Sequence, residues 1–139
     1  MAGLNTAIVG IGSNIDAERN VIAARRMLGE KLSVLGESKF VRTKPIGSRE
    51  QQDFLNGSLL IETRLGCKQL KTLLKGVEVS LGRGVGEDRY GPRKMDLDIL
   101  VWNGEIVDPD VYEREFLRRF VIELCPELEK TLKEGRGTV

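Results

Sequence analysis

The sequence predicts an α+β fold, in which an antiparallel sheet carries its helices mainly on one face. Three observations lead to this expectation. Along the 139 residues, segments with strand character and segments with helical spacing follow the order strand, helix, strand, strand, helix, strand. Asn103-Gly104 is a two-residue hairpin signal after the last of these strands. No repeat or linker interrupts the chain, so we expect residues 1–139 to form one domain with the ferredoxin-like order plus a C-terminal helical segment.

The expected elements follow from the spacing of apolar residues and from the residues that interrupt it. Strands are expected at 4–11, 33–43, 54–63 and 96–102, with a returning strand at 105–107. Helices are expected at 16–28 and 68–81, where apolar residues recur every three or four positions. Gly29 should end the first helix, Gly36 should mark a bulge, and Pro126 should interrupt a helical tail over 110–132. The segments 44–53 and 82–92 are expected to be loops.

Composition narrows the classes of function. The formal net charge is +1, so we expect neither nucleic acid nor a membrane as partner. The chain has no histidine, which excludes Ser-His-Asp catalysis and zinc sites that depend on imidazole. No apolar run could span a bilayer and no signal peptide is visible, so we expect a cytoplasmic protein, with a monomer as the default. Cys67 and Cys125 are interpreted as free thiols, with a disulfide as the alternative.

The strand expected at 96–102 carries an unusual pair of carboxylates. Asp96 and Asp98 are two residues apart, so both should point to one face, while Leu97, Ile99 and Val101 should point to the core. Like charges this close disfavour each other's ionised form unless a cation lies between them, and Mg²⁺ takes one or two carboxylates together with substrate phosphates. The alternative is a solvated pair on an exposed sheet face. Aspartate is depleted in strands, which favours the metal site.

Arginine and glycine lie next to this pair. Arg93 precedes it and Arg83 lies in the glycine-rich segment 82–92. Guanidinium groups bind phosphate oxygens bidentately, so these arginines indicate a polyphosphate substrate, although they could merely neutralise the aspartates. The segment is no Walker loop, because no Gly-Lys-Ser/Thr follows. We interpret it as a lid over a charged substrate, with a simple loop as the alternative.

Two further segments have both a plain and a functional interpretation. The glycines and Asn14 at 10–14 are expected to make a tight turn and a helix cap. Phe54 and Asn56 are two apart in a strand and share a face, where a ring could stack on a flat heterocycle and an amide could bind its edge. A core Phe and a turn Asn are the alternative.

Together these segments resemble the hydroxymethyl-dihydropterin pyrophosphokinase family of folate biosynthesis. The family's Gly-Pro-Arg followed by two strand aspartates is matched throughout residues 91–100. Residues 12–14, 42–47, 53–56 and 82–83 match other family segments in the same order, so the resemblance covers roughly residues 5–128.

The resemblance implies transfer of the pyrophosphoryl group of ATP to the hydroxymethyl oxygen of the pterin, leaving AMP. Two Mg²⁺ ions would be held by Asp96 and Asp98, and these two residues with Arg83 and Arg93 would form the catalytic set. The implied ATP-binding residues are Glu78, Arg83, Arg93, Ile99, Tyr112 and Arg118. The implied pterin-binding residues are Thr43, Pro45, Ile46, Gly47, Phe54, Asn56, Asp96 and Phe120, with Phe54 and Phe120 stacking on opposite faces. Tyr90 matches an aromatic lid position.

The last third of the chain departs from the family pattern. A Pro-His pair that the family usually has after the returning strand is replaced by Val111-Tyr112, and the connection to Arg118 is shorter. Two alternatives to the kinase therefore stay open: a ferredoxin-like module that binds a nucleotide or RNA without catalysis, and a family member that binds pterin without turnover. The RNA form is disfavoured, because the sheet lacks paired aromatics and a basic stripe.

Overall fold

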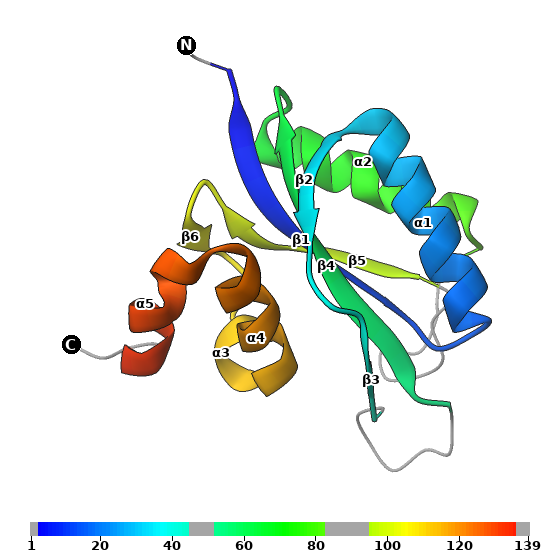
Figure 1. Ribbon diagram of the computed structural model, residues 1–139. Coiled ribbons are helices and arrows are strands. Elements are labelled where there is room, and N and C mark those ends of the chain that lie inside the picture. Colours follow the sequence, from blue (N-terminus) through cyan, green and yellow to red (C-terminus); the bar gives the residue numbers. More distant parts are fainter. Residues whose placement is uncertain (1–2, 45–51, 83–94, 136–139) are drawn as a thin grey trace.

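The computed structural model describes residues 3–44, 52–82 and 95–135, and its centre is an antiparallel sheet (Figure 1). The strands are β1 Asn5–Ser13, β2 Ser33–Glu37, β3 Val41–Thr43, β4 Phe54–Thr63, β5 Asp96–Trp102 and β6 Glu105–Ile106. The helices are α1 Ala17–Lys31, α2 Cys67–Ser80, α3 Asp110–Glu113, α4 Glu115–Leu124 and α5 Glu129–Glu134, with a 3₁₀ turn at Pro126–Leu128. The strand order is β2-β4-β1-β5-β6, and β3 also pairs with β4. The predicted α+β class and ferredoxin-like order are confirmed.

The strand expected at 33–43 is divided in two. β2 and β3 both pair with β4, and the residues between them leave the strand conformation. The register of β2 against β4 shifts between Val34 and Gly36, which confirms the bulge predicted at this glycine. The break was not predicted, because the cross-strand contacts that cause it join residues distant in the sequence.

The first helix is longer than its glycine suggested. α1 continues through Gly29 to Lys31, and the Leu32 N–H donates to the Leu28 carbonyl at 2.8 Å. The prediction that Gly29 ends the helix was therefore wrong. Tertiary packing of the apolar face of α1 outweighs the low helix propensity of a single glycine. In the C-terminal tail, Pro126 does interrupt the helices, as predicted, and it begins the 3₁₀ turn.

One face of the sheet is covered by α1 and α2 (Figure 1). Alternate residues of β1 point into this core, because side chains in a strand alternate between faces. The buried residues of this face come from both helices and from three strands, with two neighbours in the loops. They are Ala7, Val9, Ile11, Val21, Ala24, Leu28, Leu32, Leu59, Ile61, Leu70, Leu74, Val77, Met95, Leu97 and Ile99.

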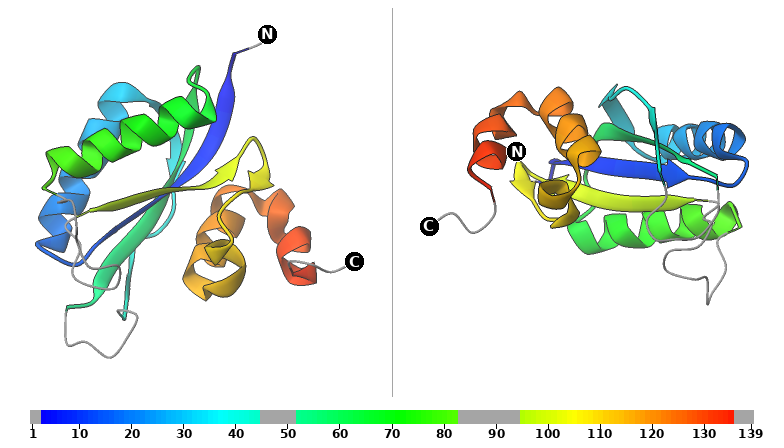
Figure 2. Two further views of the ribbon diagram at one scale, coloured as in Figure 1. Left: turned by 180° about the vertical axis from the view of Figure 1, so that it is seen from behind. Right: turned by 90° about the horizontal axis from the view of Figure 1, so that it is seen from below.

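The opposite face is covered by the C-terminal helices over one part of its area only (Figure 2). The buried residues of this second core are Ile8, Leu100, Val101, Val111, Val121 and Leu132. β5 has a bulge here: Val9 pairs with Ile99 and Ile8 with Val101, so Leu100 is the extra residue.

The bulge corrects one prediction about the direction of side chains. Val101 was expected to point with Leu97 and Ile99, but it lies in the second core with Ile8, beneath the C-terminal helices. Strict alternation holds only up to the bulge, because two residues of β5 then oppose one residue of β1. Asp96 and Asp98 precede the bulge and are unaffected by it.

The hairpin between β5 and β6 has the predicted turn. Asn103 and Gly104 have φ angles of 48° and 82°, both in the left-handed region that this two-residue turn requires. The Thr6 N–H donates to Asn103 Oδ1 at 2.8 Å, and the Asn103 N–H donates to the Thr6 carbonyl at 2.8 Å. These bonds fix the hairpin against β1.

Two other expectations concern the whole chain. Cys67 and Cys125 are free thiols, as predicted, and they pack against the cores on opposite faces of the sheet. Among the residues that the structure describes, no helix is long and apolar enough to cross a membrane.

Candidate active site

The face of the sheet beneath the C-terminal helices carries two glycines on its central strand. β1 presents Ile8, Gly10 and Gly12 there in succession, because the alternate residues Ala7, Val9 and Ile11 point to the α1 and α2 core. In the sheet register, Gly10 lies between Ser58 of β4 and Asp98 of β5, and Gly12 lies between Asn56 and Asp96. We call these four flanking residues the polar strip.

The two aspartates lie on one face, as predicted. Asp96 is half-buried and Asp98 is exposed, while Leu97 between them is buried in the core. The Leu97 N–H donates to Glu78 Oε2 at 2.7 Å, and Glu78 is itself only 6% exposed. A buried carboxylate of α2 thus fixes the backbone between the two aspartates.

Asn56 extends over Gly12 toward the aspartates. Its Nδ2 donates to Thr43 Oγ1 at 2.5 Å. A Cβ atom added at Gly12 would lie 2.6 Å from Asn56 Oδ1 and 3.8 Å from the Phe54 ring, so only glycine leaves room for the amide. The structure therefore brings together Thr43, Phe54 and Asn56, three of the residues predicted to bind the pterin.

The acidic and amide sides of the polar strip are close neighbours. Asn56 and Asp96 lie on either side of Gly12 in paired strands. Two inter-strand spacings amount to about 10 Å between their backbones, and Asn56 Oδ1 extends into this gap above Gly12. A flat acceptor held at Asn56 and a phosphate chain held at Asp96 would meet over Gly12.

Ser13 and Asn14 have a different role from the predicted helix cap. α1 begins after Asp16, and no side chain caps its first turn. Asn14 is instead buried, and its Nδ2 donates to the Gln52 carbonyl at 2.9 Å, which fixes the approach to β4. The prediction of a cap was wrong, because a partner far along the chain takes the amide.

The C-terminal candidates are placed differently from the expectation. Arg118 Nη1 donates to the Tyr112 carbonyl at 2.6 Å, so this guanidinium also ties α4 to α3. Phe120 is only 3% exposed, which leaves no open ring face for stacking. Phe116, one turn earlier on α4, is half-buried and lies edge-on to Phe120 with 5.9 Å between ring centroids. Sequence reasoning missed Phe116, although its spacing of four residues from Phe120 placed both on one helix face.

Two other predicted nucleotide contacts lie behind the polar strip. Ile99 is 7% exposed and points into the α1 and α2 core, away from the aspartate face. Glu78 is on α2 in the same layer, and it accepts a hydrogen bond from the Leu97 N–H of β5. That these two residues contact a nucleotide stays a prediction.

Asp108 is a further carboxylate that sequence reasoning missed. Its Oδ1 accepts a hydrogen bond from the Asp110 N–H at 2.9 Å at the start of α3. Burial raises the pKa of Asp108, and the nearby carboxylates of Asp110 and Asp96 raise it further. The hydrogen bond from Asp110 and the charge of Arg114 lower this pKa, but the net shift is upward.

Six of the predicted residues lie outside the described part of the chain. They are Pro45, Ile46, Gly47, Arg83, Tyr90 and Arg93.

Within the described ranges, no three His, Cys, Asp or Glu side chains form a metal cluster. A pair of carboxylates still fits Mg²⁺, which fills its remaining positions with water and substrate phosphates. The hard oxygen donors of Asp96 and Asp98 suit this ion and not a soft metal.

Comparisons with known proteins indicate one family for this chain. Residues 8–126 match the family described as 7,8-dihydro-6-hydroxymethylpterin-pyrophosphokinase. A 2-amino-4-hydroxy-6-hydroxymethyldihydropteridine pyrophosphokinase of Bacillus subtilis is 36% identical over 137 residues, covering 91% of this chain and 81% of the relative. The enzyme of the same name from Haemophilus influenzae is 31% identical, covering 88% and 83%. A folate synthesis bifunctional protein of Arabidopsis thaliana is 33% identical, covering 83% of this chain and 25% of the relative. The chain therefore belongs to the 7,8-dihydro-6-hydroxymethylpterin-pyrophosphokinase family.

Proposed function

We propose that the polar strip is where this pyrophosphokinase transfers the pyrophosphoryl group of ATP to the hydroxymethyl group of 6-hydroxymethyl-7,8-dihydropterin, giving AMP. Membership of the family makes the chain a kinase with ATP as its co-substrate. One observation carries the location of the chemistry: Asp96, which shares its strand face with Asp98, lies across Gly12 from Asn56, and Asn56 donates to Thr43.

The acidic side would receive ATP. Asp96 and Asp98 would hold two Mg²⁺ ions, which when bound neutralise charge on the phosphates. Glu78 would keep the two carboxylates in place through its hydrogen bond to the Leu97 N–H. Arg83 and Arg93 would bind phosphate oxygens bidentately, and Tyr112 and Arg118 would border the nucleotide. Phosphoryl transfer asks little covalent work of the protein, so positioning and charge neutralisation supply the rate.

The amide side would receive the pterin. Asn56 and Thr43 would bind the edge of the heterocycle, Phe54 would contact one ring face, and Pro45, Ile46 and Gly47 would complete the pocket. Phe120 was expected to stack on the other ring face but is buried, so the half-buried Phe116 beside it would make this contact from α4.

The reaction balances without a cofactor beyond the metal. The hydroxymethyl oxygen attacks the β-phosphorus of ATP, and the bond from that phosphorus to the α–β bridging oxygen breaks. AMP leaves with the bridging oxygen. The hydroxyl proton passes to water or to Asp96, the carboxylate next to Gly12 in the register.

A direct assay tests this proposal. The protein is incubated with ATP, Mg²⁺ and hydroxymethyl-dihydropterin, and nucleotides are separated by chromatography. We expect AMP only when the pterin and Mg²⁺ are both present. ADP as product, or AMP without pterin, would contradict the proposal. Binding of pterin without any AMP would indicate the non-catalytic family member.

We further propose that residues 1–139 form one domain that acts as a monomer in the cytoplasm without nucleic acid. The near-neutral net charge and the two free thiols support this. Light scattering after gel filtration would test the monomer, and a dimer mass would contradict it.

A further inference from the structure

The segment Glu37–Phe40 runs from the last residue of β2 to the start of β3, and it is held to the sheet although residues 38–40 have left the strand conformation. We call it the β2–β3 junction. The Ser38 N–H donates to the Ser58 carbonyl at 2.9 Å, and the Ser58 N–H donates to Ser38 Oγ at 2.9 Å. Ser38 is 3% exposed, so these bonds are shielded from water. The junction is thereby tied to β4, the strand that carries Asn56.

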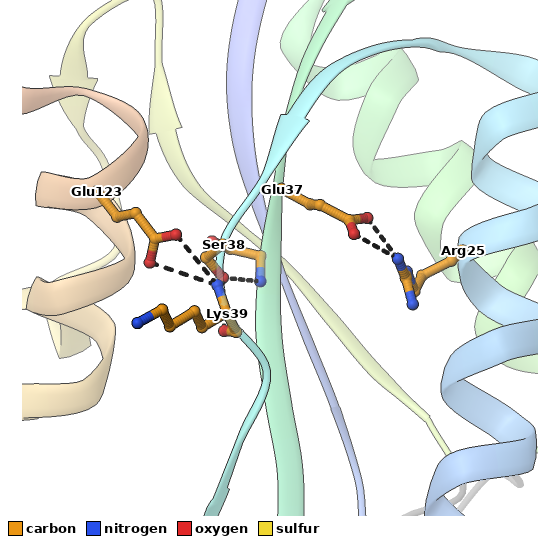
Figure 3. A network of polar contacts seen from close by, with 6 residues as sticks. Arg25, Glu37, Ser38, Lys39 and Glu123 are labelled. Atoms are coloured by element: carbon orange, nitrogen blue, oxygen red, sulfur yellow. Dashed lines mark hydrogen bonds and ion pairs between the residues drawn. The ribbon is translucent and has the colours of Figure 1, made fainter.

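Helix α4 holds the junction from the side of the polar strip. The Lys39 N–H donates to both carboxylate oxygens of Glu123, at 3.3 and 3.2 Å. Figure 3 shows Glu123 extending from α4 to the Lys39 backbone. Glu123 thus accepts a charge-assisted hydrogen bond from a backbone N–H that lies outside the hydrogen-bond ladder of the strands.

Helix α1 holds the same junction from the opposite face. Arg25 Nη2 lies 2.5 and 2.6 Å from the two carboxylate oxygens of Glu37 (Figure 3). The Arg25 guanidinium also lies over the Phe40 ring, 5.0 Å from its centroid. Phe40 in turn covers Gly57, where an added Cβ would lie 2.4 Å from ring carbons.

Among the described residues, few other contacts position the strand that follows the junction. β3 has three residues and pairs only with β4, in the part of the chain that the structure describes. Val41 and Arg42 are exposed, and the ion pair of Arg42 with Glu18 joins two exposed side chains. Such surface pairs contribute little, so the placement of β3 depends on how its preceding residues are held. Thr43, which accepts from Asn56, is the last residue of this strand.

We propose that Glu123 is a positioning residue for the pterin: by holding the Lys39 N–H, it fixes β3 and keeps Thr43 and Asn56 in register for the acceptor. This inference rests on the proposed pterin site at Asn56 and Thr43. It assigns to α4 a role in acceptor binding that does not require contact with the ligand. The effect should fall on the acceptor and spare ATP, because the junction pairs with β4 and makes no pair with β5.

Steady-state kinetics separate this role from a general structural one. Glu123→Ala should raise the KM for the pterin about threefold to tenfold, a factor typical of one lost charged hydrogen bond at a partly exposed site, with kcat and the KM for ATP within about twofold. Glu123→Gln keeps an oxygen acceptor for the Lys39 N–H and should restore most of the loss. Glu115→Ala is the matched control: it removes the same charge from the same helix, where Glu115 pairs only with Arg119 among the described contacts, and should leave the KM for the pterin unchanged.

Amide hydrogen exchange gives a second readout that needs no activity. Glu123→Ala should speed exchange at Lys39 and at the amides of 41–43, and should leave the β5 amides unchanged. The inference is overturned if the KM for the pterin stays at the wild-type value, if Glu115→Ala raises it equally, or if Glu123→Ala leaves exchange at 41–43 unaltered. Wild-type protein that makes no AMP would instead refute the proposed function, and the exchange result would still test the link from α4 to β3.

Discussion

The two faces of the sheet are built from the same strands but differ in what they bury. On the face toward α1 and α2, β1 presents Ala7, Val9 and Ile11 to a continuous apolar core. On the opposite face, the same strand presents Ile8 to the C-terminal helices and then two glycines to the polar strip. The first face therefore stabilises the fold, and part of the second is the proposed site of the reaction. Substitutions on the two faces should separate loss of stability from loss of activity.

The largest effect is expected on the polar strip. Asp98→Asn keeps the size of the side chain but removes a charge that a metal site needs, so kcat should fall about 10³-fold or more. The free energy of unfolding should stay within about 1 kcal/mol of the wild type, because Asp98 is exposed. AMP release and urea unfolding measure the two quantities. Near-normal turnover would show that Asp98 is no metal ligand.

In the core between the sheet and helices α1 and α2, a substitution is expected to lower stability and to leave activity unchanged. Leu70 on α2 is fully buried, and Leu70→Ala should lower the free energy of unfolding by about 3 kcal/mol through lost burial and a cavity. Urea unfolding measures this loss. The kcat of the folded fraction at low temperature should match the wild type, since α2 packs this residue away from the polar strip. If kcat fell as far as in Asp98→Asn, the two faces would not be separable.

A smaller effect on activity is expected at Gly12. Gly12→Ala places a Cβ 2.6 Å from Asn56 Oδ1 and should displace the amide. We expect kcat/KM for the pterin to fall about tenfold, equivalent to roughly 1.4 kcal/mol of transition-state stabilisation. Initial rates at varied pterin concentration measure it. Adding Asn56→Ala should remove the clash, so the double variant should lose no more than Asn56→Ala alone. An independent, multiplicative loss would contradict the proposed clash.

The smallest expected effect is a gain in stability. Gly76 lies in the middle of α2 on its exposed side, and nothing lies within 4 Å of a Cβ built there. Gly76→Ala should raise the free energy of unfolding by about 1 kcal/mol, because glycine is a poor helix former. Thermal unfolding measures the gain, and turnover should be unchanged. A loss of stability would mean that this side of α2 has a partner outside the described residues.

Much of the fold could be predicted because it depends on the local spacing of apolar residues and turn residues. Apolar alternation located β1, β4 and β5, and Asn103-Gly104 located the hairpin between β5 and β6. The features that sequence reasoning missed depend on contacts between distant residues. The bulge at Leu100 needs Ile8 opposite it, and the break between β2 and β3 needs Ser58 of β4.

The candidate site likewise has features that local sequence predicts and features that depend on contacts between distant residues. The shared face of Asp96 and Asp98 follows from strand geometry alone, and the structure places both as predicted. The hydrogen bond from Asn14 to Gln52 and that from Lys39 to Glu123 join residues 38 and 84 positions apart, so no motif could indicate them. The burial of Phe120 depends likewise on how α4 packs against the sheet.

The position of β1 at the centre of the sheet has a consequence for synthesis on the ribosome. β1 is made first, yet its partners are β4 and β5, and β5 comes late in the chain. At roughly 5–20 residues per second, several seconds pass in which β1 lacks its neighbour on the β5 side. A nascent chain therefore holds an open, apolar strand edge of the kind that associates with other chains. Both sides of Gly12 are completed only when β5 has been added, so substrates can bind only to a chain that has been made as far as β5.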